Sequence, residues 1–232
     1  MAETSLSTVF ANRKAERLES GLPDSLSARN YNLALCGTLT YGLVVNALMV
    51  YFLYGPLQQM ASMLGWLGML LVYLVPTIAG IVIANRSTRP LVSFLGYNLV
   101  VLPIGLMLAL VVPGLSAGIV LKAMGLTAMV TLTMTLLAVV RPQLFLGIGR
   151  TLFIALLVGL LAEVVATFLL GYRGTMFDWL FVLLFSGYIG YDVARSQVYP
   201  KTLDNAIDCA LDVYLDVINL FIRLLSILAR RD

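Results

Sequence analysis

The chain has 232 residues, of which 60% are hydrophobic and 12% are charged, and its formal net charge is +3. Soluble globular domains carry about 25% charged residues, so this composition excludes a soluble domain. It indicates an integral membrane protein in contact with the lipid bilayer. The sequence contains no histidine. This excludes catalysis by a Ser-His pair and zinc sites built from histidines.

The N-terminal residues are predicted to form a cytosolic tail. They hold four basic residues among acidic and small polar ones, namely Arg13, Lys14, Arg17 and Arg29. They contain no apolar segment long enough for a secretory signal peptide. We therefore divide the chain into a tail, residues 1–30, and a transmembrane domain, residues 31–232.

Apolar stretches of membrane-spanning length fill the rest of the sequence. A spanning helix needs about 20 mostly apolar residues. We expect seven such helices, at 32–54, 64–84, 91–112, 119–140, 151–170, 177–193 and 207–228. The expected fold is therefore an all-α, polytopic bundle. Lys and Arg are more numerous on the tail's side, which favours a cytosolic N-terminus and an external C-terminus. A seventh segment that re-entered instead of crossing would return the C-terminus to the cytosol.

The fifth stretch contains one acid, Glu163, which follows Ala155 and Gly159 at intervals of four residues. The two small residues allow a neighbouring helix to approach closely, and Glu163 would then face the bundle interior. A carboxylate at mid-membrane depth is costly, so Glu163 is a candidate functional residue. The alternative is a protonated glutamic acid bonded to a backbone carbonyl or a hydroxyl group.

The last stretch carries a stripe of aspartates four residues apart: Asp204, Asp208, Asp212 and Asp216. Two ionised neighbours about 6 Å apart would cost about 3 kcal/mol at an effective dielectric constant of about 20. Some of them should therefore hold protons near neutral pH. The same face continues to Asn219 and Arg223. Such a ridge cannot face lipid, so the seventh helix is expected at the centre of the bundle. Asp204 and Asp208 also fit a solvated helix start.

Asp192 lies near the end of the sixth stretch. In a helical hairpin, residues equidistant from the turn lie at the same depth. A turn centred near Asp204 places Asp192 level with Asp216, whereas a turn near Pro200 places it level with Asp212. Spacing therefore predicts a contact between Asp192 and an acid of the seventh helix, and it leaves open which acid.

Two C-terminal segments, GYIGYDVARSQ (187–197) and LDVYLDVINLFIRLLSIL (211–228), resemble the signature of the transmembrane Bax inhibitor motif family, of the bacterial Bax inhibitor-1-like type. The resemblance implies a central seventh helix and a pH-sensitive latch of two aspartates on the cytosolic side. The matching positions are Asp192 and Asp216. It also implies a pH-dependent calcium leak and a location in a bacterial inner membrane, and it associates eukaryotic relatives with suppression of cell death.

The sequence departs from its bacterial relatives in the second stretch. Those relatives resemble one another in an acid within this span and an arginine near its cytosolic end that contacts the latch. Here the stretch has no acid, whereas Arg86 matches the arginine. Calcium coordination through the missing acid is therefore not implied. The available substitutes are Asp208, Asp212 and Glu163.

From these residues we predict a passive cation leak, with calcium as the transported ion, latched by a proton shared between Asp192 and Asp216. The same two aspartates are the candidate calcium ligands. The residues expected to support the latch or the ion path are Arg86, Glu163, Asp208, Asp212, Asn219 and Arg223. Calcium ions and protons are the expected partners besides lipid, and no nucleic acid is expected.

Two other functions remain open. One is a proton-coupled transporter, in which Glu163 and the aspartate stripe relay protons. The other is a regulatory membrane scaffold without ion flux. An enzyme is not expected, because no nucleophile with a base and no metal-ligand cluster stands out. Cys36 and Cys209 lack the spacing of a metal site or a disulfide framework, and no cofactor is expected.

Overall fold

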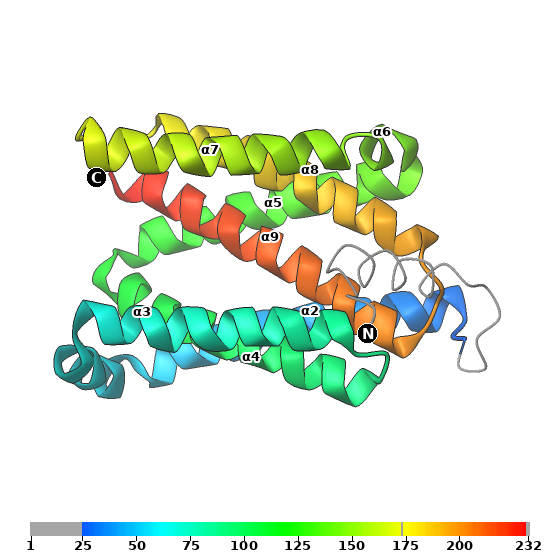
Figure 1. Cartoon of the computed structure of the whole chain (residues 1–232), viewed down its shortest axis with the longest axis horizontal. Coiled ribbons are helices and arrows are strands. Elements are labelled where there is room, and N and C mark those ends of the chain that lie inside the picture. The colour runs from blue at the N-terminus through cyan, green and yellow to red at the C-terminus, as the bar shows by residue number, and fades with distance from the viewer. Residues whose placement is uncertain (1–24, 173, 231–232) are drawn as a thin grey trace, which may run out of the picture. The chain divides into compact units, whose positions relative to one another are not determined.

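The computed structural model describes residues 25–172 and 174–230, and all regular structure in these residues is helical (Figure 1). Most of the predicted tail lies outside the described residues. The helices are α2 (Ala28–Phe52), α3 (Tyr54–Arg86), α4 (Pro90–Val111), the 3₁₀ turn η1 (Val112–Gly114), α5 (Ala117–Val140), the short α6 (Gln143–Leu146), α7 (Gly149–Leu169), α8 (Met176–Val198) and α9 (Leu203–Ala229).

Six helices in the described residues are long and apolar enough to cross a membrane. They are α2, α3 from Leu67 onward, α4 extended to Gly114, α5, α7 and α8, and they match the first six predicted spans. α9 has sufficient length, 27 residues. Its aspartates and Arg223 prevent composition alone from identifying it as a span. The protein is therefore an all-helical integral membrane protein.

Helix ends differ from the predicted ends where polar residues begin. α8 continues to Val198, whereas the prediction ended at 193, and α9 begins at Leu203, whereas the prediction began at 207. Apolar windows omit these polar turns although they are helical. Inside α3, Gly65 has a φ of 65° and interrupts the helix, so the spanning part begins after it. A residue with a side chain would rarely adopt this left-handed conformation.

The chain divides into two compact units. The first unit comprises the chain up to Val111 together with Val198–Leu211. The second unit comprises Val112–Gln197 and the residues from Asp212 onward. The start of α9 thus belongs to the first unit and the remainder to the second. Each half of the aspartate stripe consequently has its own surroundings.

In the first unit, α2, α3 and α4 lie side by side (Figure 1). The α3–α4 contact depends on two glycines. A Cβ atom at Gly80 would lie 2.5 Å from the carbonyl oxygen of Gly96 and 2.9 Å from Cβ of Leu99. The two backbones therefore touch directly, as is typical of membrane helices that pack through small residues.

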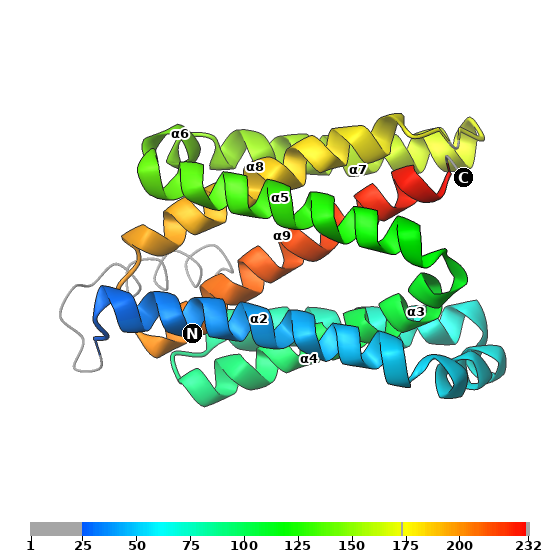
Figure 2. The same cartoon turned by 180° about the vertical axis from the view of Figure 1, so that it is seen from behind.

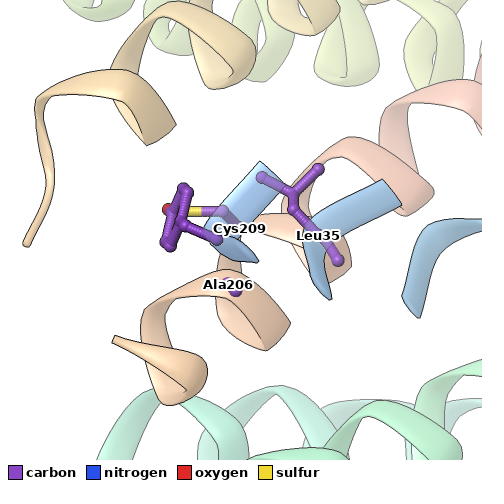
Figure 3. Packing of buried hydrophobic residues seen from close by; sticks show 5 residues of the cluster. Leu35, Ala206 and Cys209 are labelled. Atoms are coloured by element: carbon purple, nitrogen blue, oxygen red, sulfur yellow. The ribbon is translucent and has the colours of Figure 1, made fainter. Parts of the chain in front are cut away.

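The start of α9 packs on α2 within the first unit. The shared core consists of Tyr31, Leu35, Ala206, Cys209 and Ala210 (Figure 3). The Tyr31 hydroxyl donates to Sγ of Cys209 at 3.5 Å. In the loop before α9, the Lys201 ammonium lies 4.5 Å from the centroid of the Tyr31 ring, and burial lowers its pKa. These contacts anchor the first turns of α9.

In the second unit, α7 and α8 lie side by side in both views (Figure 1 and Figure 2). A Cβ atom at Gly159 of α7 would lie 3.4 Å from Cζ of Phe181, and one at Gly187 of α8 would lie 3.0 Å from Cδ2 of Leu152. Small residues thus allow close approach of the two helices, as expected for Gly159. This packing positions the acids of α7 and α8.

Candidate functional site

Asp192 of α8 and Asp216 of α9 form a buried carboxyl pair in the second unit. Each residue is 7% exposed, and the two carboxyl groups are close enough to influence each other's charge. An ionised carboxylate can only accept hydrogen bonds, so a bond between two carboxyl groups requires a proton on one of them. The pair is therefore a candidate for a shared proton.

Arg195 lies beside this pair, one turn along α8. Its Nη2 donates to Oδ2 of Asp212 and lies 3.2 Å from Oδ1 of Asp192. Its guanidinium carbon is also 5.3 Å from the centroid of the Tyr191 ring. One arginine therefore compensates two of the three neighbouring carboxyl groups. The like-charge repulsion expected along the stripe is reduced by this cation.

A second group of charges lies farther along α8 and α9 and includes an acid of α7. We call Glu163, Asp178, Arg223 and Ser226 the Arg223 cluster. Arg223 binds Glu163 through two bonds, Nη1 to Oε1 at 2.5 Å and Nη2 to Oε2 at 2.8 Å. Its Nη1 also donates to Oδ1 of Asp178 at 3.1 Å. The Ser226 hydroxyl donates to Oδ2 of Asp178 at 3.1 Å.

The Arg223 cluster connects three helices, because Glu163 comes from α7 and Asp178 from α8. The Asp178 side chain is only 6% exposed, whereas those of Arg223 and Glu163 are 20% and 27% exposed. The Arg223 guanidinium also lies over the Phe181 ring, 4.2 Å from its centroid. Arg230 is farther away, 3.8 Å from Oδ2 of Asp178, and is more exposed.

These contacts give the antiparallel register of α8 and α9 in the second unit. Residues 195, 192 and 178 meet residues 212, 216 and 226 respectively. Among these contacting pairs, the residue number rises along α9 as it falls along α8, as antiparallel packing requires. Arg195 contacts both Asp192 and Asp212, so Asp192 lies beside both of the acids that spacing left open.

Two expectations require correction. Asp204 and Asp208 are not a solvated helix start, because they are 7% and 3% exposed. Asp204 accepts a hydrogen bond of 2.6 Å from Ser93 at the start of α4. Glu163 is neither a lone carboxylate nor bonded to a backbone carbonyl, because Arg223 holds it. For Asp204 and Glu163, a partner distant in sequence supplies what the local pattern lacked.

The other predicted residues have local surroundings. Asn219 donates to the carbonyl oxygen of Leu215 in its own helix at 2.7 Å. Arg86 is exposed in the last turn of α3, in the first unit. Its predicted contact with the carboxyl pair stays a prediction. Within residues 25–172 and 174–230, no group of three or more His, Cys, Asp and Glu side chains is arranged to hold a metal ion.

Two residues of the Arg223 cluster were missed in the sequence. Asp178 is the one acid near the start of the sixth apolar stretch, and Ser226 lies three residues after Arg223. An acid in the first turn of a helix has an ordinary explanation through the helix dipole. The sequence did contain a signal for Asp178: the predicted spans hold Asp178, Glu163 and the single arginine Arg223 among apolar residues. Buried charges require partners, so these three could have been expected to meet.

Apolar helices that enclose paired acids and arginines define an α-helical, multi-pass membrane protein with an internal charge network. The Bax1-I family model, described as "Inhibitor of apoptosis-promoting Bax1", matches residues 28–232, and the chain belongs to this family. The family predicted from the two C-terminal segments is thereby confirmed. No curated protein and no solved structure matches the chain significantly.

Proposed function

We propose that this Bax inhibitor family protein is a pH-gated passive leak for cations, with calcium as the ion that crosses. The observation that supports this most directly is the burial of Asp192 and Asp216 as neighbouring carboxyl groups. This pair lies between α8 and α9, and its charge changes with protonation. Few other contacts in a histidine-free protein respond to pH in this way.

The shared proton acts as the gate. Two close carboxyl groups titrate as a unit, with one proton held in a strong, charge-assisted hydrogen bond. A second proton weakens that bond, and loss of the last proton leaves two anions that repel each other. Either change releases α9 from α8. The sign of the response depends on which released state conducts.

Oxygen-rich surroundings suit calcium, which binds six to eight oxygen ligands such as carboxylates and carbonyls. In the released state, Asp192 and Asp216 become available as calcium ligands, with Asp212 beside them. Asp208 and Asn219 extend the polar face of α9. Since the second span lacks the acid of its bacterial relatives, the ligands come from α8 and α9.

We propose further that α9 is the seventh span and lies at the centre of the bundle. Burial along α9 supports this, because protein encloses four of its polar residues, which would be costly in lipid: Asp204, Asn205, Asp208 and Asp216. The bias of basic residues supports a cytosolic N-terminus and an external C-terminus. A bacterial inner membrane is the proposed location.

The test is calcium entry into proteoliposomes across about pH 5 to 8, the range in which stability and protonation of paired acids change. Asp192→Asn and Asp216→Asn keep the side-chain shape and a hydrogen bond but cannot titrate. Each should reduce the pH dependence of entry to within about twofold, because the pair no longer titrates as a unit. Asp24→Asn, the same exchange outside the residues that match the family, is the control and should retain the wild-type pH profile.

The proposal is falsified if both variants fold and leave flux and its pH dependence unchanged. Calcium entry that is the same with and without the reconstituted protein would indicate the scaffold function. Substrate-dependent proton uptake would indicate the transporter. The pairing of Glu163 with Arg223 speaks against Glu163 as a free proton carrier, which makes the transporter the weaker alternative.

A further inference from the structure

α3 is longer than a membrane crossing requires, and a break divides it into a short helix and a span. An unbroken helix of its 33 residues would be about 50 Å long, whereas the hydrocarbon core of a bilayer is about 30 Å thick. The part from Leu67 to Arg86 has 20 residues and is already long enough to cross that core. Residues 54–64 are therefore not needed for the crossing, and Figure 1 shows the ribbon turning where α3 follows α2.

Gly65 separates the short helix from the span. Its φ of 65° and ψ of 179° lie in a backbone region that is essentially restricted to glycine. A Cβ atom at this position would meet no atom of the described residues within 4 Å. The conformation, and not a lack of space, therefore requires a glycine here. Gly65 thus fixes a change of chain direction between residues 54–64 and the span.

The short helix has one polar and one apolar face. The polar face is exposed and consists of Gly55, Gln58, Gln59 and Ser62. The apolar face consists of Leu57, Met60, Ala61 and Leu64. Both sets follow the spacing of three and four residues that places side chains on one side of a helix. The helix is therefore amphipathic, although it carries no charge.

Large apolar side chains are exposed at both ends of the short helix. We call them the apolar rim, and they are 80%, 67%, 76% and 44% exposed in the order Tyr51, Phe52, Met63 and Leu64. The rim continues the apolar surface of the two neighbouring spans, where Leu48 and Leu67 are 51% and 55% exposed. Because those spans contact lipid, the lipid-facing surface of the protein extends without interruption to the rim.

The charge pattern indicates the membrane surface and not bulk water. No charged residue occurs between Arg29 and Arg86. The polar side chains of the short helix have hydrogen bonds within it: Nε2 of Gln58 donates to the Tyr54 hydroxyl at 2.9 Å, and the Ser62 hydroxyl donates to a backbone carbonyl at 2.7 Å. Uncharged groups with such bonds lose little when the surroundings are poorer in water than bulk solvent.

We propose that residues 54–64 form an interfacial helix in the headgroup layer of the bilayer, with the apolar rim inserted towards the acyl chains. Aromatic side chains such as Tyr51 and Phe52 favour this depth. The partner is the lipid surface itself. Since the helix has no basic residues, zwitterionic lipids suffice, in contrast to basic amphipathic helices that depend on anionic lipids. The inference rests on membrane insertion of α2 and α3 and does not depend on the proposed leak.

The experiment is spin labelling of the full chain in phosphatidylcholine vesicles, after Cys36→Ala and Cys209→Ala have removed the native thiols. Collisions of the nitroxide with oxygen and with a water-soluble nickel chelate report its depth. A label at Met63→Cys should lie about 5–10 Å into the boundary between headgroups and acyl chains. A label at Gln59→Cys, on the polar face, should be shallower by roughly 5 Å.

Two further labels calibrate the depth scale. Leu71→Cys lies in the span, where the native side chain is 53% exposed, and should collide mainly with oxygen. Thr88→Cys lies in the exposed connection between α3 and α4 and should collide mainly with the nickel chelate. A Met63→Cys label as accessible to the chelate as that at Thr88→Cys would overturn the inference. A Met63→Cys label that neither reagent reaches would indicate contact with protein, such as a second copy of the chain, and would also overturn it.

The role of Gly65 is tested by a matched pair of alanine variants that carry the Met63→Cys label. Gly65→Ala disfavours the turn and should move the label towards water by roughly 5 Å, the length of one helical turn. Gly55→Ala lies in the short helix, also has no described atom within 4 Å of its Cβ, and should leave the depth unchanged. Equal depths in the two variants would refute the assignment of the turn to Gly65. If Gly65→Ala does not fold, the labels on the unaltered backbone decide the inference alone.

Discussion

The Arg223 cluster should be a major contributor to stability, and a double-mutant cycle measures its strength. Arg223→Gln removes the guanidinium that holds Glu163 by two bonds and Asp178 by one. Breaking a buried ion pair by removing one partner costs about 3–5 kcal/mol. Because the Arg223 and Glu163 side chains keep 20% and 27% exposure, the lower limit applies, about 3 kcal/mol in the free energy of unfolding.

Glu163→Gln should cost less, about 1–2 kcal/mol, because Arg223 keeps Asp178 and the amide oxygen still accepts a hydrogen bond. In the double variant the arginine and one carboxylate are both absent, so it should be more stable than Arg223→Gln alone. The coupling energy between Arg223 and Glu163 is then about 2 kcal/mol, within the range for contacting charged residues.

The assay is reversible unfolding in mixed detergent micelles at neutral pH. A chelator is present throughout, so that no divalent ion substitutes for the missing charge. Additive losses in the double variant would refute the reasoning, because independent effects mean that the ion pair carries no shared energy. An Arg223→Gln protein within about 0.5 kcal/mol of wild type would refute it equally, since that is the range of inconsequential surface changes.

Two further predictions concern the first unit and use the same unfolding assay, with one control, Gly125, from the second unit. Gly80→Ala should cost about 1–3 kcal/mol, because its Cβ would lie 2.5 Å from a backbone oxygen of α4. Gly125→Ala has nothing within 4 Å of its Cβ and should be neutral or stabilising by up to about 1 kcal/mol. Ser93→Ala removes the hydroxyl bound to buried Asp204 and should cost about 1–3 kcal/mol. Ser62→Ala, at an exposed hydroxyl, should change stability by less than about 0.5 kcal/mol. Equal losses within either pair would contradict the packing or the hydrogen bond described above.

The sequence was sufficient for features that depend on one helix at a time. Apolar length predicted the first six spans, because the bilayer requires a fixed length of apolar helix regardless of the neighbours. Two short C-terminal segments predicted the family. Spacing also reduced the partner of Asp192 to two acids, since antiparallel helices place residues equidistant from a turn at one depth.

Local sequence pattern could not identify which residues of different helices contact each other. Asp204 looked like an ordinary helix start, and only its contact with Ser93, more than a hundred positions earlier, shows it as a buried acid. Asp178 looked equally ordinary until Arg223 was found beside it. A charge in an apolar span requires a partner, but the sequence does not say which one, because rotation of each helix about its axis is set by packing.

The sequence by itself thus determined that the chain is a membrane protein of this family, with acids concentrated on its last helix, because hydrophobicity and periodicity are properties of a single segment. Only the tertiary structure decided how the charges are distributed among partners. It placed Asp192 and Asp212 at Arg195, and Glu163 together with Asp178 at Arg223. Pairing energies fall steeply with distance, so a choice among several acids and arginines is made by where packed helices bring their side chains together.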